Sequence, residues 1–243
     1  MGARERGRTL DLRSYLRLTR GVTVSIAYLL PLLAAYEVGV LWIGSDLRNS
    51  AELSLKQIAG VFGELGVWIQ RGVLLVVLGV AVRLARRDVP ALRLYPVFLL
   101  EATLLALLLG PVVSLLAGGV ALRPAVDASA VERVLLSLGA GVYEELVFRF
   151  LLLAGGFAFL HKGVGLRGGV SLAIALCASS LLFAGYHHVG PAGEPFRAVT
   201  FAFRAIAGAL LGLLFAWRGL ALCAYLHAFY NVICDLRIPG DPT

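Results

Sequence analysis

The chain alternates long apolar runs with short polar segments. An apolar run of about 20 residues is long enough to cross a bilayer as a helix. The runs of suitable length lie at 21–43, 60–84, 95–120, 133–160, 168–188, 197–217 and 219–236. This pattern predicts an all-α fold: a polytopic membrane bundle of about seven transmembrane helices in a single domain. The second run is the most interrupted, by Glu64, Gln70 and Arg71.

The composition agrees with this pattern. Hydrophobic residues make up 59% of the 243 residues and charged residues only 15%. Soluble domains are typically about 45–50% apolar and about 25% charged. The two departures together exclude a disordered chain, a coiled coil, a collagen-like fibre and an ordinary cytosolic enzyme.

The same runs divide the chain into segments. Residues 1–20 form a basic cytoplasmic tail whose end can lie on lipid headgroups as a short interfacial helix. Residues 21–132 hold the first three transmembrane spans, and the first of these is too long for a cleaved signal peptide. Residues 133–236 hold a helical core with the polar motifs described below, and 237–243 form a short C-terminal tail.

The net charge of +7 is best explained by membrane orientation. Basic residues concentrate in the N-terminal tail and in alternate loops, which predicts a cytoplasmic N-terminus. No nucleic-acid-binding motif accompanies them, so no nucleic acid is expected as a partner. We therefore expect a multi-pass protein of the bacterial inner (cell) membrane. Cys177, Cys223 and Cys234 lie in apolar runs and are interpreted as packing residues.

The fourth run places charges where lipid is expected. It contains Glu144, Glu145 and Arg149 between apolar flanks. An ionisable residue at mid-membrane costs about 2.5–3.5 kcal/mol on insertion scales, so such residues usually pair, line a cavity or do chemistry. Glu145 and Arg149 share a helical face and can form an i,i+4 ion pair. Glu144 is rotated away from that pair and is left available for chemistry.

Two later runs add polar side chains at helical spacing. Phe183 and His187 lie four residues apart near the end of the fifth run, and His227 and Asn231 lie four apart within the seventh. A carboxylate and an imidazole can move the protons of an attacking water. Donors from His227 and Asn231 can hold an oxyanion. Together these residues predict hydrolysis by activated water inside a helical bundle.

The same residues leave the use of a metal open. The chain has no H-E-x-x-H helix of the kind that binds zinc in many proteases. Carboxylate and imidazole are nevertheless ordinary zinc ligands. We expect no required cofactor, with zinc held by Glu144, His187 and His227 as the alternative.

The motif set resembles that of the CPBP (CAAX protease and bacteriocin-processing, or Abi) intramembrane proteases. The matching motifs are Glu144-Glu145-x-x-x-Arg149, Phe183-x-x-x-His187 and His227-x-x-x-Asn231. The stretch from Phe203 through Gly208 and Gly212 to Arg218-Gly219 is similar to the glycine-spaced helix that precedes the last motif of that family. The resemblance covers roughly residues 133–235.

The resemblance implies a glutamate-dependent intramembrane endopeptidase with catalytic residues Glu144, His187, His227 and Asn231. Glu144 and His187 would activate water, and His227 and Asn231 would stabilise the oxyanion. Glu145, Arg149 and Phe183 would support the site. The doubled His187-His188 offers two rings for the role of the first histidine. The expected substrate is a membrane-anchored or lipidated protein or peptide, of CAAX type or cut in C-terminal sorting or processing.

Two other functions stay open at this stage. One is a non-proteolytic membrane scaffold or bacteriocin-immunity protein that keeps these residues for folding. The other is a small transporter with ion sites at Glu37, Glu101, Glu144 and Arg204. With a cytoplasmic N-terminus, alternating spans place the C-terminus outside and predict a site that opens to the non-cytoplasmic side. The sequence assigns no oligomeric state.

Overall fold

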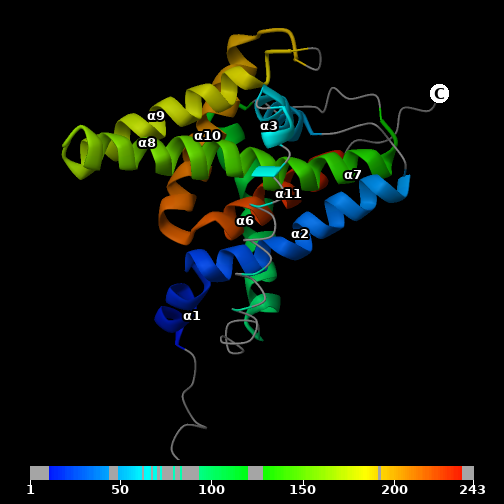
Figure 1. The fold of residues 1–243 in the computed structure, drawn as a ribbon, viewed down its shortest axis with the longest axis horizontal. Coiled ribbons are helices and arrows are strands. Elements are labelled where there is room, and N and C mark those ends of the chain that lie inside the picture. The colour runs from blue at the N-terminus through cyan, green and yellow to red at the C-terminus, as the bar shows by residue number, and fades with distance from the viewer. Residues whose placement is uncertain are drawn as a thin grey trace, which may run out of the picture.

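A computed structural model describes residues 11–43, 49–61, 93–119, 128–190 and 193–236, with residues 63–66, 68–69, 72, 79 and 83 between them. Within these residues the regular structure is helical, without strands (Figure 1). The prediction of an all-α fold is confirmed.

The N-terminal half contributes α1 (Leu12–Thr19), α2 (Val22–Ile43), α3 (Ser50–Val61) and α6 (Tyr95–Leu116). The next helix runs without a break over Ala130–Gly163, and we call it the central helix. It contains α7 (Ala130–Gly139), α8 (Gly155–Ala158) and three π-helical stretches, Ala140–Glu144, Leu146–Ala154 and Phe159–Gly163. The chain then forms α9 (Gly168–Tyr186), α10 (Ala198–Arg218) and α11 (Leu220–Leu236).

Five helices in the described part of the chain are long and apolar enough to cross a membrane. They are α2, α6, the central helix, α9 and α10. The seventh predicted run is the shorter helix α11, and the run near 60–84 lies mostly outside the described residues. The helical membrane bundle is confirmed, while the count of seven spans stays a prediction.

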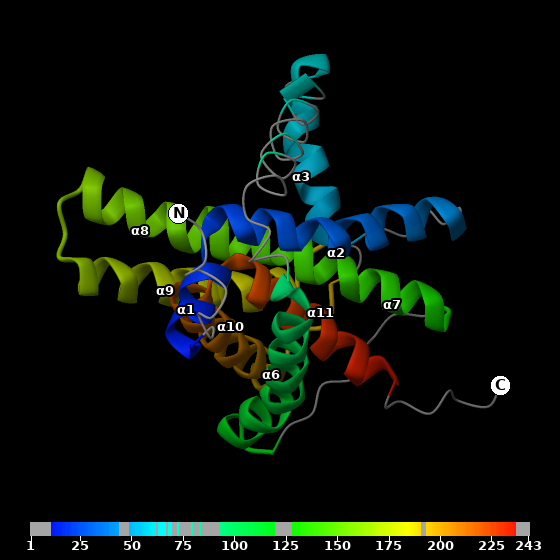
Figure 2. The ribbon, with the colours of Figure 1, turned by 90° about the horizontal axis from the view of Figure 1, so that it is seen from below.

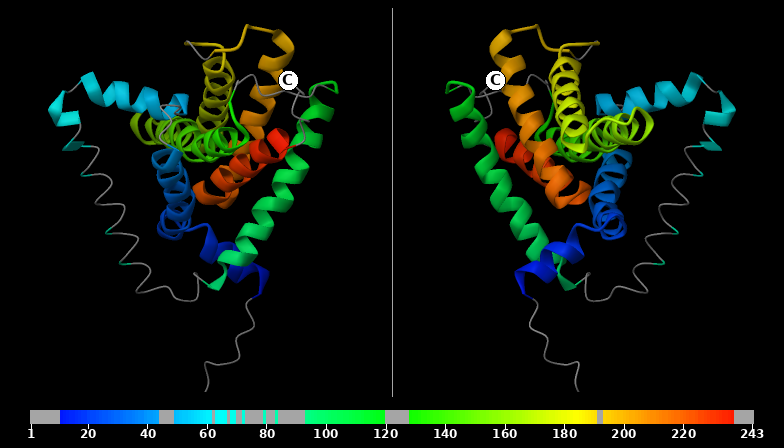
Figure 3. Two further views of the ribbon diagram at one scale, coloured as in Figure 1. Left: turned by 90° about the vertical axis from the view of Figure 1, so that its right-hand side faces the viewer. Right: turned by 90° about the vertical axis from the view of Figure 1, so that its left-hand side faces the viewer.

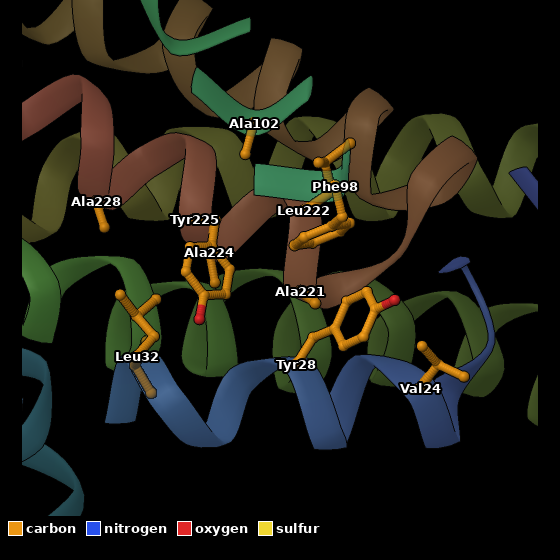
Figure 4. Packing of buried hydrophobic residues seen from close by; sticks show 11 residues of the cluster. Val24, Tyr28, Leu32, Phe98, Ala102, Ala221, Leu222, Ala224, Tyr225 and Ala228 are labelled. Atoms are coloured by element: carbon orange, nitrogen blue, oxygen red, sulfur yellow. The ribbon is translucent and has the colours of Figure 1, made fainter. Parts of the chain in front are cut away.

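Helix α11 is the core of this bundle. It lies between α2, α6 and α10 (Figure 3), and every side chain from Ala221 to Ala228 is buried. Val24, Tyr28 and Leu32 of α2 face it from one side and Phe98 and Ala102 of α6 from another (Figure 4). A helix that is apolar all round needs such cover from its neighbours.

A glycine brings the central helix against α11. A Cβ added at Gly141 would collide with the carbonyl oxygen of Ala224 and would lie 2.7 Å from the Cβ of Ala228. Real Cβ atoms essentially never approach other atoms so closely. The missing side chain therefore allows the two backbones to touch one turn before the glutamates.

The N-terminal helix α1 is fixed to the bundle. The hydroxyl of Tyr15 donates to Glu101 of α6 at 2.5 Å, and buried Arg218 at the end of α10 makes two contacts with the same carboxylate, at 2.8 and 2.5 Å. Burial and the hydrogen bond to Glu101 hold the pKa of Tyr15 above its usual range. The end of α10 thus meets α1, where Arg218 also donates to the carbonyl of Leu16 at 3.4 Å. Figure 2 shows α6 running across the direction of α2, the central helix and α9. The predicted helix at the end of the tail is present, and its place on lipid headgroups stays a prediction.

Candidate active site

The central helix carries both glutamates. It begins with a capping box in which Ser129 and Glu132 each bind the other's backbone N–H. From Ala140 onward the backbone adopts wider π-helical turns. Such turns are frequent at functional sites because they change the direction in which side chains point. The sequence predicts the helix but not this widening.

Glu145 and Arg149 form a buried ion pair, as the i,i+4 spacing predicts. Arg149 Nη1 lies 3.1 Å from Glu145 Oε1, and both side chains are at most 1% exposed. Arg149 also donates to the carbonyl of Gly208 on α10 at 3.4 Å. The charge of Glu145 is thus balanced by Arg149, which also joins the central helix to α10.

Glu144 has a different environment. It is buried, and Asn49 Nδ2 donates to its Oε1 at 3.1 Å. Its other oxygen, Oε2, is enclosed and accepts no hydrogen bond from any described residue. This oxygen lies 3.8 Å from His187 Nε2 and 3.9 Å from His227 Nε2. One carboxylate oxygen therefore faces two imidazoles at a distance too long for a direct hydrogen bond.

Both imidazoles are oriented through their Nδ1 atoms. His187 Nδ1 lies 2.8 Å from the carbonyl of Phe183, which can only accept, so Nδ1 carries a proton. His227 Nδ1 lies 2.7 Å from Glu145 Oε1, and an ionised carboxylate again fixes a proton on Nδ1. Each Nε2 is then directed toward Glu144. This is the usual way in which a second partner fixes a histidine tautomer.

Phe183 touches most of the site. Its ring packs edge-on against His187 and His227, with centroids 4.8 and 5.9 Å apart, and against Phe148. The guanidinium of Arg149 lies 4.4 Å from its centroid on the ring face, a cation–π arrangement. Phe183 therefore provides an apolar wall that holds both imidazoles.

The adjacent histidine, His188, points away from the glutamates. Its Nδ1 lies 3.0 Å from the carbonyl of Glu194, and its ring contacts Phe196 and Phe201. Of the two rings offered by the sequence, the one near Glu144 is that of His187.

Asn231 is the predicted site residue that the structure connects least. It lies one turn after His227 on α11 and is partly exposed. No hydrogen bond joins it to another residue in the described part of the chain. The structure thus brings Glu144, Glu145, Arg149, Phe183, His187 and His227 into contact and places Asn231 beside them on the same helix.

Sequence reasoning missed Asn49. Asn49 directly precedes α3, and its Oδ1 accepts the backbone N–H of Ala51 at 2.9 Å. Asn before a helix is a recognisable N-cap signal. Nothing in the local pattern, however, connects residue 49 with residue 144, because that contact depends on how α3 packs.

The ionisable residues considered for transport are paired at separate places. Glu37 accepts from the hydroxyl of Tyr143 at 2.5 Å, Glu101 pairs with Arg218, and Arg204 pairs with Glu194 at 2.6 Å. Each of these three residues is therefore held by a partner of its own.

The three atoms considered for zinc are Glu144 Oε2, His187 Nε2 and His227 Nε2. They face one another, and the carboxylate oxygen has no other partner among the described residues. Their separations of 3.8 and 3.9 Å are wider than a preformed metal site requires, and no group of three His, Cys, Asp or Glu side chains in the described ranges has that geometry.

A comparison with known protein families finds a match over the part of the chain that carries these site residues. Residues 127–233 match the family model described as "Type II CAAX prenyl endopeptidase Rce1-like". Comparison with curated proteins and with solved structures finds no match. The matched segment contains both glutamates, His187, His227 and Asn231. The resemblance predicted from the motifs is thus confirmed, and residues 127–233 of this membrane-helical chain are similar to the type II CAAX prenyl endopeptidase Rce1-like family.

Proposed function

We propose that the protein is an intramembrane endopeptidase that hydrolyses a peptide bond near the C-terminus of a membrane-anchored or lipidated substrate. The family supports a protease of CAAX type in a membrane helical protein. The observation that carries the proposal is the unpartnered Glu144 Oε2, which faces His187 and His227 inside the bundle.

Glu144 acts as the general base. Its Oε2 accepts a proton from water as the water oxygen attacks the substrate carbonyl carbon. His187, fixed by the carbonyl of Phe183, directs Nε2 to the same place and can pass a proton to the leaving amine. The protonated Glu144 first passes its proton to His187 Nε2, which makes the ring an imidazolium. When the C–N bond breaks, the leaving amine takes that proton from Nε2, and the carboxylate and imidazole recover their starting states.

His227 and Asn231 stabilise the oxyanion. His227 Nδ1–H is already directed to Glu145, so donation from Nε2 requires the imidazolium form. The buried carboxylate of Glu145 stabilises that cation, and Arg149 balances Glu145 when the imidazole is neutral. The amide of Asn231, one turn away, is available as the second donor.

Zinc is the alternative cofactor. Glu144, His187 and His227 would hold it, and the ion would polarise the substrate carbonyl and acidify a bound water. The proposal of catalysis without metal predicts that chelator-washed protein keeps its activity and carries no stoichiometric zinc on elemental analysis. Activity that is lost on chelation and restored by zinc would establish the alternative.

The test in cells compares the termini of membrane proteins between cells with the wild type and cells with Glu144→Gln. We expect new C-termini that are present with the wild type and absent with the variant. His188→Asn is the matched control, because its ring faces Phe196 and Phe201, and it should keep the wild-type pattern. An unchanged set of termini with Glu144→Gln would favour the scaffold or immunity function.

A further inference from the structure

We infer that Asn49 is a positioning residue for Glu144, so that the start of α3 sets the orientation of the catalytic carboxylate. This inference rests on the proposed function. It adds to the site a residue that lies outside the family match at 127–233.

Asn49 is held from three directions. Its side chain is buried, and its Oδ1 caps α3 by accepting the N–H of Ala51 at 2.9 Å. Its backbone N–H donates to the hydroxyl of Tyr36 on α2 at 3.1 Å. The remaining donor of the side chain, Nδ2, is thereby directed to Glu144 Oε1 at 3.1 Å.

This arrangement gives the two carboxylate oxygens of Glu144 different environments. Oε1 accepts the amide proton of Asn49, and Oε2 is left without a hydrogen bond, facing the two imidazoles. A hydrogen bond from a fixed amide to one oxygen holds the plane of the carboxylate. Without it, the carboxylate could rotate and direct neither oxygen to the attacking water.

The rest of α3 is also anchored to the walls of the site. Glu52 interacts with Tyr36 and Lys56, which secures the first turn of the helix. Ser54 lies 2.8 Å from the hydroxyl of Tyr186, the residue before His187. Helix α3 therefore contacts both the glutamate and the histidine side of the site, and Asn49 is its contact with the reacting group.

The test uses variants that keep the helix cap. Ser and Asp are both good N-cap residues. Asn49→Ser retains the cap and removes the donor to Glu144. We expect its kcat on a farnesylated C-terminal CAAX peptide to fall about tenfold or more with KM unchanged. Ser54→Ala, which removes a bond of α3 that does not touch Glu144, serves as the control and should change kcat far less.

Single and double variants test the hydrogen bond between Asn49 and Glu144 through thermal stability, without any substrate. Asn49→Asp places a second carboxylate beside Glu144 and should lower the melting temperature by about 5 °C. In the double variant Asn49→Asp with Glu144→Gln, the amide and the carboxylate have exchanged places, and the melting temperature should recover. The double variant should nevertheless be inactive, because the base is displaced.

The peptide-cleavage assay and the melting-temperature assay distinguish a failure of the proposed function from a failure of the inference about Asn49. If the wild type cleaves no peptide but the double variant recovers its melting temperature, the proposed function fails and the contact stands. If the melting shifts are additive, or if Asn49→Ser keeps the wild-type kcat, Asn49 does not position Glu144 and the inference is overturned.

Discussion

Glu144 and Glu145 are adjacent in the chain but have different partners. Each has one oxygen without a hydrogen bond from a described residue. Glu145 is paired through its other oxygen with Arg149 and His227, whereas the free oxygen of Glu144 faces His187 and His227 and Glu144 has no arginine partner among the described residues. A buried carboxylate with a fixed counter-charge serves structure, and one without it, facing two imidazoles, can take up a proton. The two environments assign different roles to the two residues.

This difference predicts a stability effect for Glu145→Gln. The substitution leaves Arg149 buried without its counter-charge, and breaking such a pair costs about 3–5 kcal/mol. The melting temperature of the purified protein should therefore fall by roughly 10 °C. Glu144→Gln, which still accepts from Asn49, should melt close to the wild type. Equal melting temperatures for all three proteins would contradict the structural role of Glu145.

His227 and Asn231 should behave as one unit, because they share a helix face and, in the proposed mechanism, bind the same oxyanion. Loss of one oxyanion donor typically lowers the rate by about 10²–10³. Effects within such units are not additive, so His227→Ala with Asn231→Ala should be little slower than His227→Ala alone. The measurement is kcat of the two single variants and the double variant. Full additivity would show that the two residues have separate roles.

The sequence predicts the site residues that are neighbours on one helix. It misses a residue that reaches the site only through packing between helices. The contacts of Glu145 with Arg149 and of Phe183 with His187 follow from helical spacing, as does the place of Asn231 one turn after His227. Asn49 could not be found, because its contact with Glu144 spans 95 positions. No single-sequence pattern encodes such a distance.

At the scale of the helices, the site depends on how closely the central helix packs against α11. The glycine that allows it, Gly141, lies one turn before the glutamates and touches Ala224 and Ala228. The apolar pattern predicts both helices. It does not predict the π-helical turns, because the sequence periodicity that indicates a helix is too coarse to distinguish π from α hydrogen bonding.

Gly141→Ala should therefore force the two helices apart. The added methyl group meets backbone rather than a flexible side chain, so the clash cannot be relieved locally. We expect a loss of both stability and activity, by about 1–3 kcal/mol in unfolding free energy. Gly155→Ala on the same helix is the matched control, since nothing lies within 4 Å of its added Cβ, and alanine should be neutral or stabilising there. Equal melting temperatures for the two variants would contradict the packing role of Gly141.

For the whole molecule, the contacts around Glu101 bear on topology. Glu101 near the start of α6 binds Tyr15 of α1 and Arg218 at the end of α10. Tyr95 and Phe98 of α6 pack 5.0 and 4.7 Å from Tyr28 in the first half of α2. The chain that leaves α2 at Ile43 has therefore returned toward the start of α2 when α6 begins.

The alternating topology makes a prediction for reporter fusions. With a cytoplasmic N-terminus, fusions after Arg93 and Lys162 should report the inside and a fusion after Thr243 the outside. The site would then draw water from the non-cytoplasmic side. A cytoplasmic C-terminus would contradict this topology.

The central claim is that Glu144 is the base of an intramembrane peptidase. The most direct measurement is cleavage of a farnesylated C-terminal CAAX peptide by the purified protein in lipid vesicles, with mass spectrometry of the released C-terminal fragment. We expect the wild type and His188→Asn to release it and Glu144→Gln, folded to the same melting temperature, to be slower by several orders of magnitude. Near-normal turnover by Glu144→Gln, together with a well-folded but inactive Glu145→Gln, would contradict the account and reverse the roles of the two glutamates.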